Sequence, residues 1–436
     1  MNSRLTAPFL SFCLLIISFA GAVAQQSART VTKIEVEGLV RLTAAEVIAS
    51  SGLKTGTPLS VPALDAAGQK LFDSGLFTKV AYRTTSKGNQ VTVILQVEEV
   101  AGGQSPVVFD NFVWFTNDEL TAAIKREVPS YDGMAADAGR MTDDIKRALE
   151  NLLRERHVDG VVEYLPELSM GSGPGSHLFS VSGVPIPVCS LHFPGASNIP
   201  ESKLVKSAKQ FTDADYSSSG AMTIARVTLL PLYSQAGQLR AKFSRPTVEL
   251  ATAESCKGGV DVTIPVVEGP IFLWDKTAWT GNTVLPQAEL DEALGMKTGE
   301  VANGVKFDKG LFEVQKRYAA HGYLAARLRP QPEFDEAYRR VSYNILVKEG
   351  PRYRMGNLII TGLSEAEARS LQALWKLRSG DVYNDDYLET FFVRDARLEL
   401  AHIMSQRKPG FGPTTRTTPN HDTLTADVTI EFKSVP

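Results

Sequence analysis

Short apolar runs that alternate with polar residues recur along the whole chain. The segments "VDVTIPV", "VSYNILV" and "ADVTIEF" carry apolar side chains at every second position. This period predicts β-strands that bury one face only. Five other apolar runs each precede a loop and a helix-like segment, and each is expected to open a structural unit: they lie at 31–38, 107–115, 188–195, 272–281 and 354–362.

Two helix-like segments follow each opening strand. The stretches 42–60 and 285–303 share a short amphipathic segment and a "GxKTG" turn. Each ends on a residue suited to cap the next helix, Ser60 or Asn303. The longer helix of the fourth unit is predicted from one apolar stripe at helical spacing, formed by Phe307, Leu311, Val314 and Tyr318.

A predicted hairpin closes each unit. Gly75 and Gly322 stand where the end of a helix needs a left-handed residue. The first hairpin strands are expected at 77–83, 160–165, 238–243 and 323–328, and the second at 90–99, 177–183, 259–269, 340–350 and 424–433.

The repeated order predicts an α+β chain of five β-α-α-β-β domains. Each domain is expected to be a small three-stranded mixed sheet with two helices on one face, and the domains to form an elongated array. The predicted boundaries are 30–100, 105–184, 186–269, 270–350 and 351–436.

Three segments depart from this pattern. Pro231 interrupts the second helix of the third unit and should kink it. The stretch "MGSGPGS" at 170–176 is typical of a flexible insert. The segment 407–420 holds too much proline and glycine for a good strand, which weakens the prediction of a first hairpin strand in the fifth unit.

The first 24 residues read as a cleaved signal peptide. Arg4 precedes the apolar run "PFLSFCLLIISFAGA", and "AVA" at 22–24 is a small-x-small cleavage site. The alternative is an uncleaved anchor. We expect export to the periplasm, a location peripheral to the outer membrane, and no transmembrane segment in the mature chain.

Composition and charge exclude several classes of function. The chain of 436 residues is 43% hydrophobic and has a net charge of −3, which does not favour nucleic-acid binding. Its histidines are scattered and none is spaced for a metal site. The acidic pair Asp385–Asp386 follows Asn384 at a helix start, where it suits the helix dipole. The sequence therefore predicts no enzyme, no cofactor and no metal.

The repeating unit resembles the POTRA (polypeptide-transport-associated) domain. The resemblance rests on "IEVEGLVRL", "LFDSGLFTKVAYR", "YAAHGYLAARL" and the closing "VVEGP" and "VKEGP", and extends over residues 30–436. Five such domains resemble the periplasmic arm of bacterial outer-membrane protein assembly factors. In that family the arm precedes a transmembrane β-barrel. The fifth unit closes at Pro436, so we expect no barrel in this chain.

The resemblance implies a non-enzymatic scaffold or chaperone-like arm. Its partners would be outer-membrane β-barrel proteins, unfolded barrel clients or a separately encoded assembly barrel. A sheet covered on one face leaves an edge strand to which an extended segment can add. The candidate edges are the first hairpin strands: Val80, Ala81, Tyr82 and Arg83 in the first unit, and Arg240, Ala241, Lys242 and Phe243 in the third.

Two alternatives stay open for these edges. They could be solvated or covered by the next unit, and the chain could be a structural spacer between envelope components without client binding.

The resemblance also implies a disulfide. Cys189 lies in the opening strand of the third unit and Cys256 just before its closing strand, and these strands are parallel neighbours in a POTRA sheet. We expect the two sulfurs to be bonded. The alternative is a pair of buried free thiols.

Overall fold

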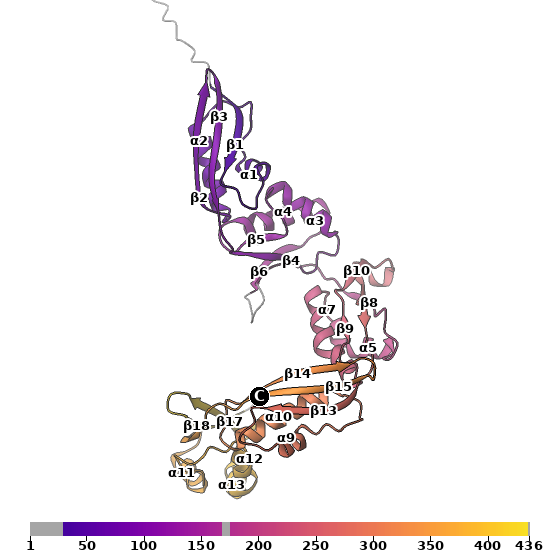
Figure 1. The fold of residues 1–436 in the computed structure, drawn as a ribbon, viewed down its shortest axis with the longest axis vertical. Coiled ribbons are helices and arrows are strands. Elements are labelled where there is room, and N and C mark those ends of the chain that lie inside the picture. The colour runs from indigo at the N-terminus through magenta and orange to yellow at the C-terminus, as the bar shows by residue number, and fades with distance from the viewer. Residues whose placement is uncertain (1–28, 168–174, 435–436) are drawn as a thin grey trace, which may run out of the picture. The chain divides into compact units, whose positions relative to one another are not determined.

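The computed structural model describes residues 29–167 and 175–434 and shows a mixed α+β protein (Figure 1). The signal peptide predicted at residues 1–24 and most of the insert predicted at 170–176 lie outside the described residues. The chain divides into two compact units, of which the first ends at Val184 and the second begins at Pro185. In the part that is described, no helix is both long and apolar enough to cross a membrane. We name the five predicted segments repeat 1 to repeat 5.

Repeat 1 has one three-stranded sheet in the order β1-β3-β2. The strand β1 runs parallel to β3, and β2 runs antiparallel to it. The elements are β1 (Thr30–Glu37), α1 (Ala44–Ser51), α2 (Val61–Asp73), β2 (Phe77–Lys87) and β3 (Gln90–Glu99).

The helix boundaries of repeat 1 follow from local chemistry. Thr43 and Glu46 form a reciprocal capping box at the start of α1, and Ser60 caps α2 as predicted. Gly75 has the predicted left-handed conformation, with φ of 78°. A Cβ atom there would lie 1.9 Å from the Ala138 carbonyl oxygen, so only glycine fits.

Repeat 2 has a four-stranded sheet in the order β5-β4-β7-β6. Its first strand ends at Phe109, which corrects the prediction of a strand over 107–115. The side chain of Asn111 takes over the pairing beyond that point, because its amide bonds both the N–H and the C=O of Val181. The elements are β4 (Gln104–Phe109), α3 (Asn117–Glu127), β5 (Met134–Ala136), α4 (Met141–Glu155), β6 (Val161–Glu167) and β7 (Ser176–Ser182).

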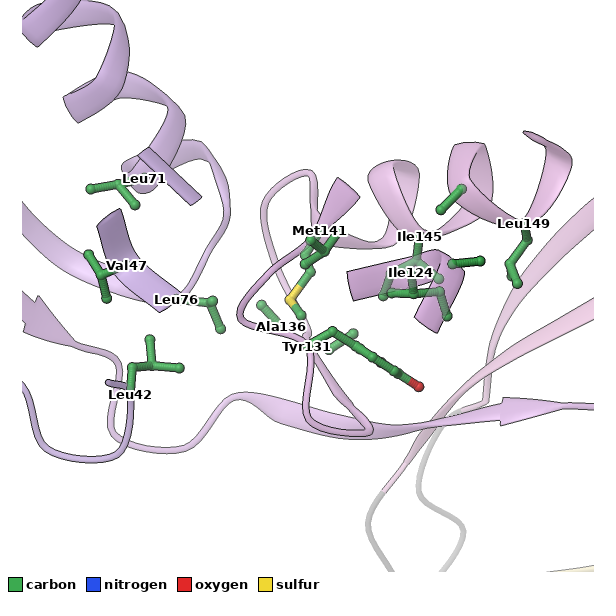
Figure 2. Close-up of a cluster of buried hydrophobic side chains, with 14 of the residues drawn as sticks. Leu42, Val47, Leu71, Leu76, Ile124, Tyr131, Ala136, Met141, Ile145 and Leu149 are labelled. Atoms are coloured by element: carbon green, nitrogen blue, oxygen red, sulfur yellow. The ribbon is translucent and has the colours of Figure 1, made fainter. Parts of the chain in front are cut away.

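Repeats 1 and 2 share one hydrophobic core. The buried side chains of Leu71 and Leu76 in repeat 1 belong to the same cluster as those of Met141 and Ile145 in repeat 2 (Figure 2). A continuous core of this kind resists bending between two domains, because separating them exposes apolar surface to water.

Repeat 3 contains short strands and a long interrupted helix. The helix widens into a π-helical turn just before Pro231, where the N–H of Leu230 bonds the carbonyl of Ala225. The predicted disturbance at Pro231 thus takes the form of a π turn. The elements are β8 (Val188–His192), α5 (Glu201–Ser207), α6 (Lys209–Thr212), α7 (Ser218–Ile224), the π turn (Ala225–Leu229), α8 (Leu230–Gln235), β9 (Lys242–Phe243), β10 (Thr247–Leu250), a 3₁₀ turn (Glu254–Cys256), β11 (Val260–Thr263) and β12 (Val266–Val267).

Repeat 4 has a sheet in the order β13-β15-β14, the same topology as repeat 1. Asn303 caps the long helix as predicted, and the predicted apolar stripe packs into the core of this repeat. The elements are β13 (Leu273–Thr280), α9 (Gln287–Leu294), α10 (Gly304–Ala320), β14 (Arg327–Asp335) and β15 (Arg340–Lys348).

Repeat 5 repeats this topology in the order β16-β18-β17. A ten-residue strand, β17, lies within the segment 407–420, so the proline and glycine of this segment do not prevent a strand. The elements are β16 (Arg354–Thr361), α11 (Glu365–Leu374), α12 (Tyr387–Thr390), a π turn (Phe391–Asp395), α13 (Arg397–Ser405), β17 (Phe411–Asn420) and β18 (Thr425–Ser434).

Candidate binding interface: the free sheet edges

One edge of each three-stranded sheet is already occupied by the chain itself. In repeat 1, the N–H of Gly56 bonds the carbonyl of Val31 at 2.7 Å, and the N–H of Val31 bonds the carbonyl of Thr57 at 2.9 Å. Gly299 and Glu300 pair with Trp274 in the same way in repeat 4. The "GxKTG" motif therefore closes the edge of the opening strand and leaves the opposite edge for a partner.

The opposite edges, β2, the four-residue β10, β14 and β17, each pair with one neighbour only within the described residues. Two of them are interrupted by proline. Proline stays paired in an edge strand only where its nitrogen points outward, since it has no N–H for the ladder. The strand β14 thus loses outward N–H groups at Pro330 and Pro332, and β17 loses them at Pro413 and Pro419. The edge strand β6 of repeat 2 contains Pro166.

The strand β2 contains no proline over its eleven residues. Its outward groups can be identified from β3. The Val91 carbonyl accepts a hydrogen bond from the Thr32 hydroxyl on β1, so the backbone groups of Val91 point toward β1 and away from β2. Ser86 is the partner of Val91 on β2, and its backbone groups therefore point away from β3. Because the pattern alternates, the outward N–H and C=O groups belong to Val80, Tyr82, Thr84 and Ser86.

Helix α2 lies alongside this edge (Figure 1). The Tyr82 hydroxyl donates a hydrogen bond of 2.6 Å to Asp65 on α2. A Cβ atom added at Gly68 would lie 3.9 Å from a methyl group of Val80, so the helix passes close to the strand. The structure thus brings the predicted residues Val80, Ala81, Tyr82 and Arg83 together on a free edge with a helix beside it.

The third-repeat residues are placed differently. Only Lys242 and Phe243 of the predicted strand 238–243 are in a strand, β9, which pairs with β12. The N–H of Ala241 bonds the carbonyl of Gln238 in a turn, and Ala241 is buried. The strand prediction for Arg240 and Ala241 is therefore wrong.

The junction with repeat 4 explains this difference. The guanidinium of Arg240 lies over the ring of Phe334, 4.4 Å from its centroid, and forms an ion pair with Glu336. Gly237 packs against Phe272 at the same junction. Interactions with the next repeat, which a local pattern does not reveal, hold this segment as a turn.

The cysteine pair lies at one end of the repeat 3 sheet. Cys189 is in β8 and Cys256 follows in the 3₁₀ turn before β11, and the structure joins them in a disulfide. The strands β8 and β11 are parallel neighbours, as the resemblance implied.

A repeated glutamate ends the last strand of several repeats, and the sequence analysis missed its role. The carboxylate of Glu99 accepts hydrogen bonds from the N–H groups of Val40, Arg41 and Leu42. Glu268 accepts from the backbone of residues 197–199, and Glu349 from that of residues 283–284. The recurrence of "VEE", "VVEG" and "VKEG" at the ends of these repeats is the sequence pattern that could have predicted this role.

These carboxylates are held in the charged form. Burial alone would raise the pKa of Glu268, but the hydrogen bonds from Ser197, Asn198 and Ile199 outweigh it and lower the pKa to about 2. The pKa of Glu99 and that of Glu349 are lowered by the same balance. The glutamates therefore fix the loop after the opening strand in repeats 1, 3 and 4 and have a structural role.

His321 has a structural explanation as well. Its Nδ1 lies 2.9 Å from the carbonyl oxygen of Arg317 at the end of α10, so this nitrogen donates to the helix terminus. Gly322 follows with φ of 87°. Over residues 29–167 and 175–434, no cluster of three or more histidine, cysteine or acidic side chains could hold a metal ion.

An open polar hollow lies between α10 of repeat 4 and the α12 region of repeat 5. Its lining carries charges of both signs, with Glu313, Lys316 and Arg317 on one side and Asp386, Glu389 and Arg394 on the other. It contains neither histidine nor cysteine. The arrangement gives no nucleophile activated by a base.

Comparison with known families identifies the class of domain. The family model of the POTRA domain, described as surface antigen variable number repeat, matches residues 29–100 and 275–350. These two segments are similar in sequence to the POTRA domain.

Two curated proteins are similar in sequence. A putative outer membrane protein assembly factor of Treponema pallidum is 25% identical over 204 residues, which cover 45% of this chain and 24% of that protein. The outer membrane protein assembly factor BamA of Neisseria meningitidis serogroup B is 29% identical over 102 residues, which cover 23% of this chain and 13% of that protein. The matched part of this chain thus spans a quarter or less of either relative.

Solved structures of the same kind are also similar. The POTRA3-5 fragment of Haemophilus influenzae BamA has 19% identity and a TM-score of 0.44, and the match covers 57% of this chain and 96% of that one. The POTRA1-2 fragment of Omp85 from Anabaena has 21% identity and a TM-score of 0.26, and the match covers 38% of this chain and 96% of that one.

Proposed function

We propose that this chain is a periplasmic POTRA scaffold in the assembly of outer-membrane proteins, and that it binds extended polypeptide segments by strand addition at β2. It acts as a chaperone-like arm without catalysis. Its partners are unfolded outer-membrane β-barrel proteins or a separately encoded assembly barrel.

The observation that carries the proposal is the uninterrupted outer edge of β2. Strand addition requires consecutive outward N–H and C=O groups, and β2 offers them from Val80 to Ser86. The strands β14 and β17 each lack two outward donors because of proline. Proteins commonly prevent edge strands from pairing with other chains by placing proline in the strand or by covering its edge. The strand β2 has neither feature within the described residues.

The relatives support the assignment to outer-membrane protein assembly. Both carry names that describe assembly factors of outer membrane proteins, and both align with this chain. Periplasmic location rests on the signal peptide predicted over residues 1–24 and on this resemblance.

We also propose that repeats 1 to 5 are five POTRA-like domains, with boundaries at 30–100, 105–184, 186–269, 270–350 and 351–436. The observation behind this division is that no sheet extends from one segment into another: four segments have one small sheet each, and repeat 3 has two. Expression of repeats 4 and 5 as separate fragments tests it, because a correct boundary yields a cooperative unfolding transition in each fragment.

Site-specific photocrosslinking in the native bacterium tests the function. A crosslinking residue at Thr84 should capture outer-membrane barrel proteins or an assembly component. The matched control is Gln331, which is exposed on the edge strand β14 between Pro330 and Pro332. Equal capture from both positions, or capture from neither, would contradict strand addition at β2.

The spacer hypothesis has support of its own in the junction between repeats 3 and 4. The contact of Arg240 with Phe334 and Glu336 ties the two repeats together, as a fixed spacer requires. In that case, Thr84 captures nothing while the chain still copurifies with one folded envelope protein.

A further inference from the structure

The side chains of β2 form two rows with different chemistry. Val80 and Tyr82 pack against the core beneath the helices. Side chains alternate along a strand, so Lys79, Arg83 and Lys87 lie together on the open face, at every fourth position. All three are exposed, and Ala81 and Thr85 lie between them.

This cationic row is only partly neutralised within repeat 1. Arg83 forms an ion pair of 2.7 Å with Glu37 across the sheet. Among the described residues, Lys79 and Lys87 form no ion pair, and their cross-strand partners on β3 are Glu98 and Gln90. A strand added beside β2 would therefore place its open-face side chains directly opposite a positive row.

The helix side of the same edge carries an exposed apolar side chain near each end. Val61, Asp65, Gly68 and Phe72 occupy one face of α2 at helical spacing. Asp65 and Gly68 of this face contact Tyr82 and Val80 of β2. Val61 and Phe72, near the two ends of the face, are 58% and 52% exposed, which is high for apolar side chains.

We propose that the occupant of β2 is an amphipathic extended segment that carries carboxylates on one face and apolar side chains on the other. Aspartate or glutamate at every fourth residue pairs with Lys79, Arg83 and Lys87, and the opposite face covers Val61 and Phe72. This inference rests on the proposed strand addition and adds the chemistry of the client to it.

A second copy of this chain fits the edge less well. Pairing β2 with β2 of another copy would place lysine and arginine side chains on the same face of neighbouring strands, where like charges repel. The same row that selects an acidic client therefore disfavours self-association through this edge.

Binding of short fluorescent peptides to the full mature chain tests the inference. In each of three peptides, valine alternates with one other residue: glutamate in the first, threonine in the second and lysine in the third. We expect the glutamate peptide to bind about tenfold more tightly than the threonine peptide and the lysine peptide to bind most weakly, because two to three cross-strand charge pairs are gained or lost. Added salt should reduce these differences.

Charge reversal on β2 provides a second test of the inference. In K79E/K87E, the order of the glutamate and lysine peptides should be reversed. The matched control K33E/K54E makes the same charge change on the side of β1 and should keep the wild-type order. Equal affinity for the three peptides, or an unchanged order in K79E/K87E, would overturn the inference.

The failure of this inference can be separated from failure of strand addition. If the peptides bind equally and Thr84→Pro abolishes binding of all three, strand addition stands and the charge preference is wrong. If none binds, both are wrong. A dimer in sedimentation that Thr84→Pro converts to a monomer would show that a second copy occupies the edge, and would also overturn the inference.

Discussion

The hydroxyl of Tyr82 and the carboxylate of Asp65 lie 2.6 Å apart and tie the edge strand β2 to helix α2. This hydrogen bond also raises the pKa of Tyr82. The contact positions the helix beside a strand whose outer backbone is free, so the apolar end residues of the helix flank the same edge. The proposed binding site is thus a backbone edge with a cationic row on one side and two exposed apolar side chains, Val61 and Phe72, on the other.

Two helix glycines should respond in opposite ways to alanine. In Gly68→Ala, the new Cβ lies at an ordinary contact distance from Val80, and the gain in helix propensity should stabilise the protein by about 0.5–1 kcal/mol. In Gly310→Ala, the Cβ would lie 2.2 Å from the Leu294 carbonyl oxygen, and we expect a loss of about 1–3 kcal/mol. Urea unfolding of the two variants checks the signs, and a destabilising Gly68→Ala would contradict the described packing of α2 on β2.

Proline scanning of β2 should separate binding from stability. Thr84→Pro removes an outward N–H, so it should abolish strand addition while changing stability by less than about 1 kcal/mol. Thr85→Pro removes an N–H that points to β3 and should cost about 1–3 kcal/mol. Peptide binding and thermal unfolding of the pair test the assignment. If Thr84→Pro is the more destabilising variant, the inward and outward positions have been assigned the wrong way round.

Stability should fall with pH as Glu268 is protonated. The pKa of Glu268 is about 2 in the folded protein and ordinarily 4.5, so its contribution is complete above pH 4.5 and is lost as the pH falls toward 2. The contribution is on the order of 3 kcal/mol.

Comparison of wild type with Glu268→Gln measures this contribution. The difference in unfolding free energy should be largest near neutral pH and should shrink in acid. Glu333→Gln, at an exposed position in β14, is the control and should show little difference at either pH. A Glu268→Gln difference that does not depend on pH would rule out the carboxylate as its source.

The disulfide should be detectable directly. Mass spectrometry of the unreduced protein from its native cells should find Cys189 and Cys256 in one crosslinked peptide pair. The sequence separation of 67 residues gives a stabilisation of about 4 kcal/mol in the chain-entropy treatment, so Cys189→Ser/Cys256→Ser should unfold at a clearly lower temperature. Two free thiols in that protein would refute the disulfide.

Local patterns were enough to predict the α+β class and two of the helix caps. Ser60 and Asn303 cap helices because a side-chain oxygen at that point satisfies a free N–H, which is a local effect. Period-2 runs predicted the central strands for the same reason, since alternation follows directly from burial of one face.

The errors occurred where distant parts of the chain decide the conformation. Arg240 lies in a turn because it packs on Phe334 of the next repeat. The strand β17 tolerates Pro413 and Pro419 because it lies at an edge, which the composition of 407–420 alone does not show. Of the candidate site, the edge at Val80–Arg83 could be predicted from topology, but the contrast with the proline-interrupted edges required the register of every sheet.

Residue-resolved amide hydrogen exchange on the bound protein tests strand addition at β2 most directly. The peptide that alternates valine with glutamate is added to the mature chain, and exchange of the β2 amides is compared with and without it. The account predicts new protection at Val80, Tyr82, Thr84 and Ser86, while the amides of Ala81, Arg83 and Thr85, already bonded to β3, change little. Binding that leaves the four outward amides exchanging as before would contradict the account.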